Sequence, residues 1–349
     1  MENRVLQFAS DYQEGACKSI IDRLVETNME STQGYGSDRY TQSAIERIRR
    51  ALKKSDAQVE LLVGGTQTNA TVIDAVLKGY EGVVAAETGH VALHEAGAIE
   101  FGGHKVLTVP AMKGKLSSQV LSEYLRDFFA DENHEHMVQP GMVYISQPTE
   151  YGTLYSLEEL EDISRVAHSY SLPLYVDGAR LAYALASDEN DVSLEDLARL
   201  CDVFYIGGTK CGALFGEAVV IPDPSFIKHF LTIKKQHGGL LAKGRLLGIQ
   251  FDELFRDDLY LRIGESADRY ARLIQSEISK NDRISLYFPT PTNQSFLVVP
   301  NDRLKWLSEF VTYSFWEKND EKSTVIRLAT SWATTEEDTQ RLLEIIRNI

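Results

Sequence analysis

Three segments of the sequence place a chemically capable residue directly after a run of apolar residues that is typical of a buried strand. In the first, LPLYVDGAR, Asp177 ends the apolar run and Arg180 follows closely. A carboxylate in this position can be buried against a cation, although a helix cap or a purely structural ion pair with Arg180 would explain the same residues. Because open α/β sheets build their sites at the carboxyl ends of strands, Asp177 is a candidate site residue.

The second segment, CDVFYIGGTKCG, carries Lys210 beyond Tyr205, Ile206 and two glycines. A lysine that is buried among small residues is desolvated, which lowers its pKa and makes the neutral amine a nucleophile that can form a Schiff base. A surface lysine that lays its stem along apolar neighbours is the alternative.

The third segment, LLVGGTQTN, runs from a strand through two glycines into Thr66 and Gln67 and then into a predicted helix. Glycines let the backbone approach an anion, and the first amides of the helix can then bind a phosphate. An ordinary β-to-α turn is the alternative for this segment taken alone.

Together the three segments are more specific than any one of them. A phosphate cradle, an aspartate and a lysine follow one another in that order. This is the layout expected for pyridoxal phosphate, in which the lysine forms the internal aldimine and the aspartate holds the pyridinium nitrogen.

Other motifs are incomplete. His94-Glu95 is not followed by a histidine at the helical spacing of a zinc motif, and His134-Glu135-His136 lacks a third ligand nearby, so we expect no metal site. The GGTK sequence before Cys211 departs from a Walker A motif, which needs glycine directly before its lysine and Ser or Thr after it. Neither GxGxxG nor GxSxG occurs, so a Rossmann fingerprint and a hydrolase nucleophile elbow are also excluded.

Strand-length apolar runs alternate with helix-period segments through the first two thirds of the chain. This pattern predicts an α/β fold with a mostly parallel sheet covered by helices. Ser156 and Glu159 form a predicted capping box at the start of one helix. Further helices are predicted over 44–52 and 68–80, and strands over 82–87, 105–110, 142–147, 172–177, 203–207 and 218–221.

The pattern of predicted elements changes after about residue 245. Long charged helices are followed there by predicted strands at 285–288, 295–299 and 324–330. A final helix is predicted to begin at Thr334, with Glu337 completing a second capping box. We therefore expect a large domain over 1–245, including an N-terminal arm, and a small C-terminal α+β domain over 246–349.

Composition and charge exclude several classes of protein. The chain has 349 residues, of which 43% are hydrophobic and 25% charged, as in ordinary globular proteins. Its net charge of −15 repels nucleic-acid phosphates and anionic lipid, so we expect neither as a partner. Three scattered cysteines fit a reducing compartment, and no apolar run approaches the length of a membrane span or a signal core. These features predict a cytoplasmic protein.

The chain resembles the threonine aldolase and aromatic amino acid β-eliminating lyase family of fold-type-I pyridoxal-phosphate enzymes. The resemblance runs from Ser10-Asp11 to the C-terminal helix, and the VDGAR segment with its downstream Thr209-Lys210 is its most specific part. Further segments that carry it are Tyr35-Gly36, GGTQTN, ETGHVALHEAGA, KKQHGG and VIRLATSWATTEED.

The resemblance implies roles for individual residues. Lys210 would form the internal aldimine, Asp177 would hold the pyridinium proton, and His90 would stack on the cofactor ring. Gly65, Thr66, Gln67 and Thr209 would contact the phosphate, and Arg180 would bind near the 3-oxygen of the ring or the substrate carboxylate. Arg327 and Ser10 would grip that carboxylate, and His136 aligns with a second active-site histidine of the family. Where the family has a phosphate-binding arginine this chain has GGLLAKGR, so Lys243 or Arg245 can take that place.

The expected activity is a retro-aldol cleavage of a β-hydroxy-α-amino acid, such as L-threonine or L-allo-threonine, to glycine and an aldehyde. His90 or His136 would be the general base, because imidazole titrates near the operating pH. β-Elimination, racemisation or transamination would use the same Lys210 and Asp177. A non-catalytic binding protein of this fold is a further alternative, which the intact Lys210, Asp177 and Arg327 argue against.

The resemblance also implies self-association. In that family the active site is completed across a dimer, and Tyr35-Gly36 lies in the segment that crosses between subunits. We therefore expect a homodimer or homotetramer.

Overall fold

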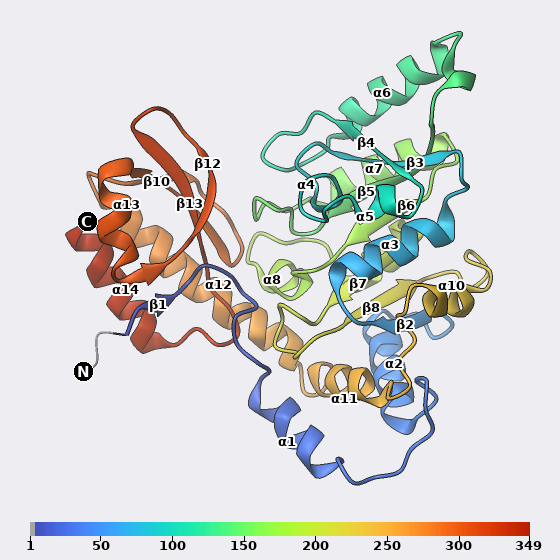
Figure 1. The fold of residues 1–349 in the computed structure, drawn as a ribbon, viewed down its shortest axis with the longest axis horizontal. Helices are drawn as coiled ribbons and strands as arrows, with labels where there is room; N and C mark the ends of the chain where they lie inside the picture. Colours follow the sequence, from blue (N-terminus) through green and yellow to red (C-terminus); the bar gives the residue numbers. More distant parts are fainter. Residues whose placement is uncertain (1–3) are drawn as a thin grey trace.

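A seven-stranded sheet forms the centre of the larger part of the chain in the computed structural model, which describes residues 4–349 (Figure 1). The strands lie in the order β2-β8-β7-β6-β5-β3-β4. β8 runs antiparallel to its neighbours β2 and β7, and the other neighbouring pairs are parallel. The strands are β2 (Gln58–Leu62), β3 (Glu81–Ala86), β4 (Lys105–Val109), β5 (Gln139–Ser146), β6 (Leu174–Asp177), β7 (Val203–Gly207) and β8 (Glu217–Ile221).

The predicted mostly parallel α/β sheet is confirmed, with small shifts at the strand ends. Two strands begin more than one residue from the predicted position. β5 begins at Gln139, before the predicted residue 142, and β6 begins at Leu174, after the predicted residue 172. Pro173 has no N–H to give to a ladder, and the N–H of Leu172 closes the preceding turn on Ala167 O at 3.0 Å. The strand can therefore pair only beyond the proline.

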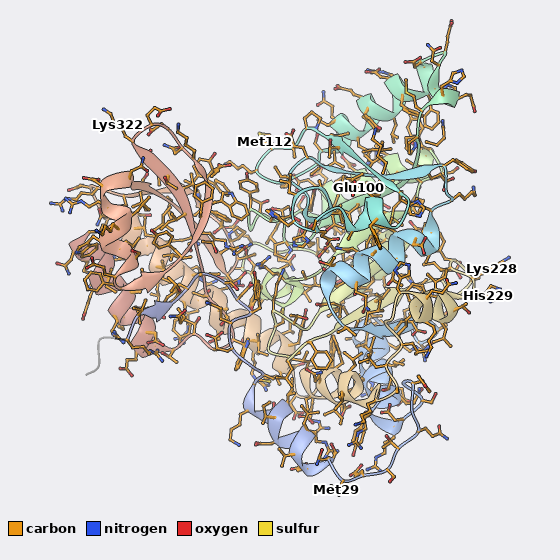
Figure 2. All side chains as sticks on the ribbon, viewed as in Figure 1. Met29, Glu100, Met112, Lys228, His229 and Lys322 are labelled. Carbon is orange, nitrogen blue, oxygen red and sulfur yellow. The ribbon has the colours of Figure 1, made fainter. Side chains whose placement is uncertain are left out.

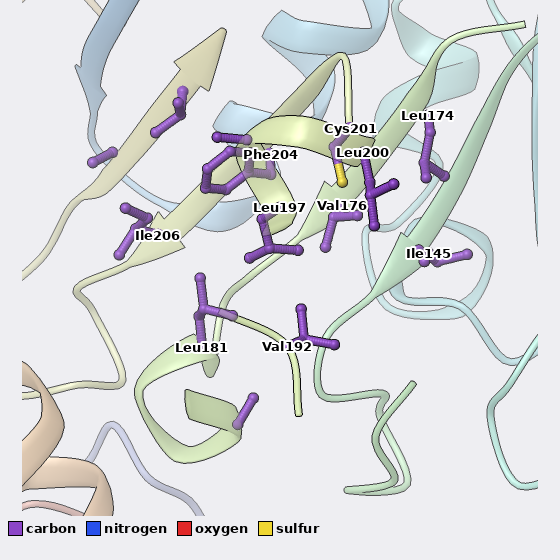
Figure 3. Packing of buried hydrophobic residues seen from close by; sticks show 14 of the residues in the cluster. Ile145, Leu174, Val176, Leu181, Val192, Leu197, Leu200, Cys201, Phe204 and Ile206 are labelled. Carbon is purple, nitrogen blue, oxygen red and sulfur yellow. The ribbon is translucent and has the colours of Figure 1, made fainter. Parts of the chain in front are cut away.

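Apolar residues alternate between the two faces of this sheet, and helices cover both faces. On one face, Val143, Ile145 and Val176 pack against the helices α6 (Ser118–Ala130), α7 (Leu157–Ser169) and α9 (Leu194–Leu200). On the other face, Met142 and Tyr144 pack with residues of α3 (Gly65–Val76). Figure 3 shows the first of these layers, in which Leu197 and Leu200 of α9 lie near Val176, Phe204 and Ile206.

The helices of this part begin and end where local signals place them. Ser156 and Glu159 form the predicted capping box of α7, and α3 begins at Gly65, three residues before the predicted start. The helices are α1 (Lys18–Glu26), α2 (Arg39–Ala51), α3 (Gly65–Val76), α4 (His90–Leu93), α5 (Ala98–Phe101), α6 (Ser118–Ala130), α7 (Leu157–Ser169), α8 (Leu181–Ala186), α9 (Leu194–Leu200), α10 (Phe230–Gln236) and α11 (Arg245–Leu254).

The C-terminal part has a four-stranded antiparallel sheet in the order β12-β13-β10-β9, with helices packed on it (Figure 1). The final helix is capped by Thr335, whose side chain accepts from Asp338 N, so the predicted cap at Thr334 was one residue early. The elements are α12 (Leu259–Ile278), β9 (Ser285–Phe288), β10 (Gln294–Pro300), α13 (Asn301–Ser308), β12 (Ser314–Lys318), β13 (Ser323–Ala329) and α14 (Glu336–Asn348).

The N-terminal arm joins the two parts. β1 (Leu6–Gln7) pairs in parallel with β11 (Val311–Thr312) of the C-terminal part, and the chain then crosses to the larger part before α1 (Figure 1). The division into 1–245 and 246–349 stays a proposal. Most of α11 lies on the C-terminal side of that division, but it contacts α2 on the other side. Asp252 of α11 accepts hydrogen bonds from Ser43 at 2.6 Å and from Arg47 at 2.7 Å, both on α2.

Within residues 4–349, no helix is long and apolar enough to cross a membrane.

Candidate active site

The carboxyl ends of β2, β6 and β7 meet at a cavity of about 270 Å³. Its wall contains most of the residues that the sequence marks as site candidates. A second cavity of about 520 Å³ shares His90, Arg180 and Lys210 with it and continues toward the C-terminal part. The first cavity includes Gly65, Thr66, His90, Asp177, Arg180, Thr209 and Lys210 among its lining residues.

Lys210 lies on the turn that follows β7. Two glycines before it allow close backbone approach, since a Cβ atom on Gly207 would lie 2.3 Å from Ala179 O and one on Gly208 would lie 2.7 Å from Gly216 O. Burial lowers the pKa of Lys210, and the Arg180 guanidinium acts in the same direction. The local structure therefore favours the neutral, nucleophilic amine.

Asp177 ends β6 and is buried, with hydrogen bonds to both carboxylate oxygens. Tyr205 donates to Oδ1 at 2.5 Å, Tyr144 to Oδ2 at 2.6 Å and Asn69 to Oδ2 at 3.0 Å. Burial acts to raise the pKa of Asp177, but His90 and these donors outweigh it and hold the pKa below its ordinary value. Asp177 is thus a stable anion that can hold a proton on a pyridine nitrogen.

His90 begins α4, and its imidazole is fixed by a buried carboxylate. Its Nδ1 lies 2.8 Å from Oε1 of Glu95, which also accepts from Asn69 at 2.7 Å. Because Asn69 donates to Asp177 as well, a continuous set of hydrogen bonds joins His90 to Asp177. An Nδ1–H that donates to Glu95 leaves Nε2 of His90 free to accept a proton.

The first turn of α3 presents its backbone to the cavity where the sequence predicts an anion cradle. Gly65 and Thr66 line the cavity, and no side chain caps the helix, so its first amides are available to an anion. The side chain of Gln67 is committed elsewhere, with Oε1 accepting from Val63 N at 3.1 Å and Nε2 donating to His237 O at 3.0 Å. Gln67 can therefore offer only its backbone N–H.

Two arginines lie where a substrate carboxylate is expected. Arg180 makes a buried bidentate ion pair with Asp11. Arg327 bonds to Gln294 Oε1 at 2.9 Å and to Ala9 O at 3.2 Å, while its Nε is buried without a partner among the described residues. Burial lowers the pKa of Arg327 to about 10, with Arg180 acting in the same direction. The group still carries its charge at neutral pH.

Ser10 lies beside this region without lining either cavity. Its hydroxyl accepts from Tyr12 N at 3.3 Å, and its neighbour Asp11 is the residue that reaches Arg180. Burial opposes ionisation of Asp11, but Arg180 and Lys210 lower its pKa to about 2. Asp11 was not singled out in the sequence, because its partner lies 169 positions away.

The structure does not bring His136 to the site. His136 is exposed and ends a single 3-10 turn (His134–His136) before β5, whereas Lys210 and Asp177 follow the carboxyl ends of their strands. A strand of this length separates the two edges of the sheet by roughly 25 Å. Within one chain, His136 therefore lines neither cavity, and its assignment as a base stays a prediction.

His94, which the sequence suggested only as part of an incomplete zinc motif, is a second histidine near the site. It lies in the second cavity with His90, Lys210 and Arg327, and its ring centroid is 5.7 Å from that of His90. Partial burial lowers the pKa of His94, and His90 and Arg327 act in the same direction. The spacing of four residues in HVALH carried this signal, because it places both rings on one side of a helical turn.

The residues present fit pyridoxal phosphate. Lys210 offers an amine with a lowered pKa for the aldehyde, Asp177 offers an anion for the pyridine nitrogen, and the first turn of α3 offers backbone amides for the phosphate. With the mostly parallel sheet, this donor set defines a pyridoxal-phosphate enzyme of fold type I.

The chain belongs to the beta-eliminating lyase family, whose model matches residues 7–298. It is 31% identical to the low specificity L-threonine aldolase of Pseudomonas aeruginosa, with all of this chain and 98% of that protein covered. The enzyme of the same name from a Pseudomonas species is 30% identical, with all of this chain and 99% of that protein covered.

Solved structures agree with this assignment. Threonine aldolase of Leishmania major is 39% identical, with a TM-score of 0.94 over 98% of this chain and 99% of that one. Histidinol-phosphate aminotransferase of Clostridium acetobutylicum has a TM-score of 0.75 at 14% identity over 99% of this chain and 98% of that one, which shows the fold alone. The resemblance expected from the sequence is confirmed.

Proposed function

We propose that this protein is a pyridoxal-phosphate-dependent aldolase. It would cleave the Cα–Cβ bond of a β-hydroxy-α-amino acid, such as L-threonine or L-allo-threonine, to glycine and an aldehyde. The observation that carries the proposal is one continuous wall on which a buried lysine with a lowered pKa, two imidazoles and a buried arginine face the same space. The names of the relatives, low specificity L-threonine aldolase, support the same reaction.

The chain binds and orients the substrate before any bond breaks. When bound, pyridoxal phosphate supplies an electron sink that weakens the bonds at Cα. Arg327 has a buried Nε–H without a partner among residues 4–349, and it would bind the substrate carboxylate through charge-assisted hydrogen bonds. Lys210 would exchange protons at Cα once its amine is released, and Asp177 would keep the pyridine nitrogen protonated.

The β-hydroxyl proton must leave as the aldehyde forms, and an imidazole is suited to take it. Nε2 of His90 is free because Nδ1 is bound to Glu95. His94 is held neutral by its lowered pKa and lies in the same cavity. We assign these two histidines, in place of the His90 and His136 pair, to proton removal from the β-hydroxyl, directly or through water.

The first test is to incubate cofactor-loaded protein separately with L-threonine and L-allo-threonine, and to quantify glycine, acetaldehyde, pyruvate and keto acids. Equal glycine and acetaldehyde support the aldolase. With these substrates, 2-oxobutyrate with ammonia would instead indicate β-elimination. The hydroxylated keto acid of threonine would indicate transamination, and inversion at Cα would indicate racemisation. No turnover and no visible absorbance with added cofactor would favour a binding protein.

Variants separate the roles of these residues. Lys210→Ala should abolish turnover, whereas Lys228→Ala, an exposed lysine far from the cavity (Figure 2), should not change it. His94→Phe should lower kcat by about 10²-fold if this ring removes the proton. Full activity in Lys210→Ala would refute the proposal, and full activity in His94→Phe would leave His90 as the base.

We also propose that the protein is a homodimer or homotetramer. Tyr35 has a left-handed φ of 57° and is 53% exposed, and Met29 on the segment after α1 is 90% exposed at the outer edge of the molecule (Figure 2). Apolar residues so exposed are suited to an interface. Light scattering should give a multiple of the chain mass, and Met29→Glu should shift it toward the monomer.

We propose a cytoplasmic location, without nucleic acid or membrane as partners. Cys17, Cys201 and Cys211 are free thiols, as in a reducing compartment. The net charge of −15 disfavours polyanions.

A further inference from the structure

A buried carboxylate lies at the end of the cavity where an anion is expected to bind. Glu217 begins β8, which runs antiparallel between β2 and β7, so that Glu217 pairs with Leu62 and with Gly207 at the ends of those strands. It is 3% exposed and lines the same cavity as Gly65 and Thr66. Glu217 therefore shares the space with the amides of the anion cradle.

The hydrogen bonds of Glu217 come from neutral donors. Gly208 N donates to Oε2 at 3.0 Å, and Thr209 Oγ1 donates to Oε1 at 2.7 Å. The hydroxyl of Thr209 also accepts from Gly216 N at 3.0 Å, so its proton is committed to Glu217 and is not free for a phosphate. Burial raises the pKa of Glu217 to about 8, although Thr209 and Lys210 oppose this effect.

The two residues that could have replaced the family's phosphate-binding arginine do not lie in this cavity. Arg245 donates to the carbonyl oxygens of Glu30, Thr27 and Asn28. Lys243 is exposed. An ionised carboxylate beside a phosphate dianion would be strongly repelled, because charges interact more strongly in a buried site than in water. The chain therefore needs Glu217 to be neutral when a phosphate lies in the cradle.

We propose that Glu217 takes up a proton from solvent when the cofactor's phosphate binds, and that the neutral carboxyl group donates a hydrogen bond at the phosphate end of the site. Cofactor binding is then linked to proton uptake, and the holoenzyme loses cofactor as pH rises. The proposal rests on cofactor binding and not on the aldol reaction, so its test uses a ligand that undergoes no turnover.

Other titratable groups act on Glu217 and must be kept constant in the test. Lys210 is the cation that acts on it and Asp177 the neighbouring anion. The titratable groups linked to Glu217 in this way are Lys210 and Cys211 after β7, Asp177 and Tyr175 on β6, Tyr205 on β7 and Tyr260 on α12.

The test measures binding of pyridoxamine 5′-phosphate, which cannot bond to Lys210, to the cofactor-stripped full chain. Titration calorimetry in buffers of different ionisation enthalpy gives the protons taken up between about pH 7 and about pH 9.5. Near pH 9 the wild type should take up about one proton more on binding than Glu217→Gln does. Above pH 8, the Kd of the wild type should rise about tenfold per pH unit relative to the Kd of Glu217→Gln. At pH 7 the two proteins should bind pyridoxamine 5′-phosphate with similar affinity, because the side-chain amide of the variant also donates a hydrogen bond.

Two controls make the result specific. Phosphate-free pyridoxamine shares the ring and amine, so it should show no difference between wild type and Glu217→Gln. Asp268→Asn removes another buried carboxyl group whose pKa is raised to about 8, on α12 and outside the cavity wall, and should keep the wild-type proton uptake. Equal proton uptake by wild type and Glu217→Gln would overturn the proposal. Weaker binding of both ligands by Glu217→Gln at every pH would also overturn it. That result would mean that Glu217 only stabilises the turn of Gly208 and Thr209.

Discussion

Arg180 and Asp11 form a buried bidentate ion pair, with 2.6 Å between Nε and Oδ2 and 3.0 Å between Nη2 and Oδ1. The pair joins the N-terminal arm to the turn after β6. Because Asn293 also donates to Asp11 Oδ2 at 2.9 Å, the same carboxylate contacts the C-terminal part. Asp11 therefore holds three distant segments around Lys210.

Asp11→Asn should destabilise the protein by about 3 kcal/mol at neutral pH, because it leaves Arg180 buried without a counter-charge. The folded pKa of Asp11, about 2, lies below its ordinary value of 3.8. The pair's stabilisation is thus present above about pH 4 and is lost as pH falls toward about pH 2. Urea unfolding at several pH values checks this. Asp22→Asn, in an exposed pair with Lys18, should have little effect, and an equal effect of the two variants would contradict the prediction.

Glu95→Gln should lower kcat by about 10²-fold without a matching loss of cofactor. The amide can present its NH₂ to Nδ1 of His90 and so place the imidazole proton on Nε2, where an acceptor is needed. Kinetics at saturating cofactor, together with the visible absorbance of the bound cofactor, measure this. Glu100→Gln, an exposed residue of the next helix (Figure 2), is the control. Unchanged kcat in Glu95→Gln would show that catalysis does not depend on which nitrogen of His90 carries the proton.

Arg327→Lys should raise KM for the amino acid by about 10- to 100-fold and lower kcat much less. An ammonium group keeps the charge but cannot reproduce the hydrogen bonds of a planar guanidinium. Steady-state kinetics give the two constants separately. Arg303→Lys on α13 should leave both constants as they are, and a loss in kcat alone for Arg327→Lys would argue against carboxylate binding.

Asp268→Asn should stabilise the protein at pH 8 by about 2 kcal/mol or more. Both carboxylate oxygens of Asp268 are buried without a partner among the described residues, and burial raises its pKa to about 8. The stability that this carboxyl group contributes when protonated is complete below about pH 4 and is lost as pH rises to about 8. The advantage of the amide should therefore grow over that range in urea titrations, and a constant difference would contradict the assignment.

The strand-end residues of the site could be predicted because their signals are local. Asp177 and Lys210 follow apolar runs in the sequence, and glycines precede Lys210. Asn69, Glu95 and Asp11 could not be found in this way, since their roles depend on contacts with segments far away in the chain.

His136 lies outside the cavity of its own chain for a related reason. The resemblance placed it beside a strand, but the chemistry depends on which end of the strand a residue adjoins, and His136 precedes β5.

Short strands were also missed. β1 has two residues, too few to show the alternation that predicts a strand.

The pairing of β1 with β11 has a consequence for how the protein is made. The N–H of Leu6 bonds to Phe310 O, and Ser314 bonds to Ala9 O, so the arm that carries Asp11 docks on residues near the other end of the chain. During synthesis the arm leaves the ribosome well before the residues on which it docks. A nascent chain can thus form the strands that carry Asp177 and Lys210 early, while Arg180 receives its counter-charge only after the C-terminal part has emerged.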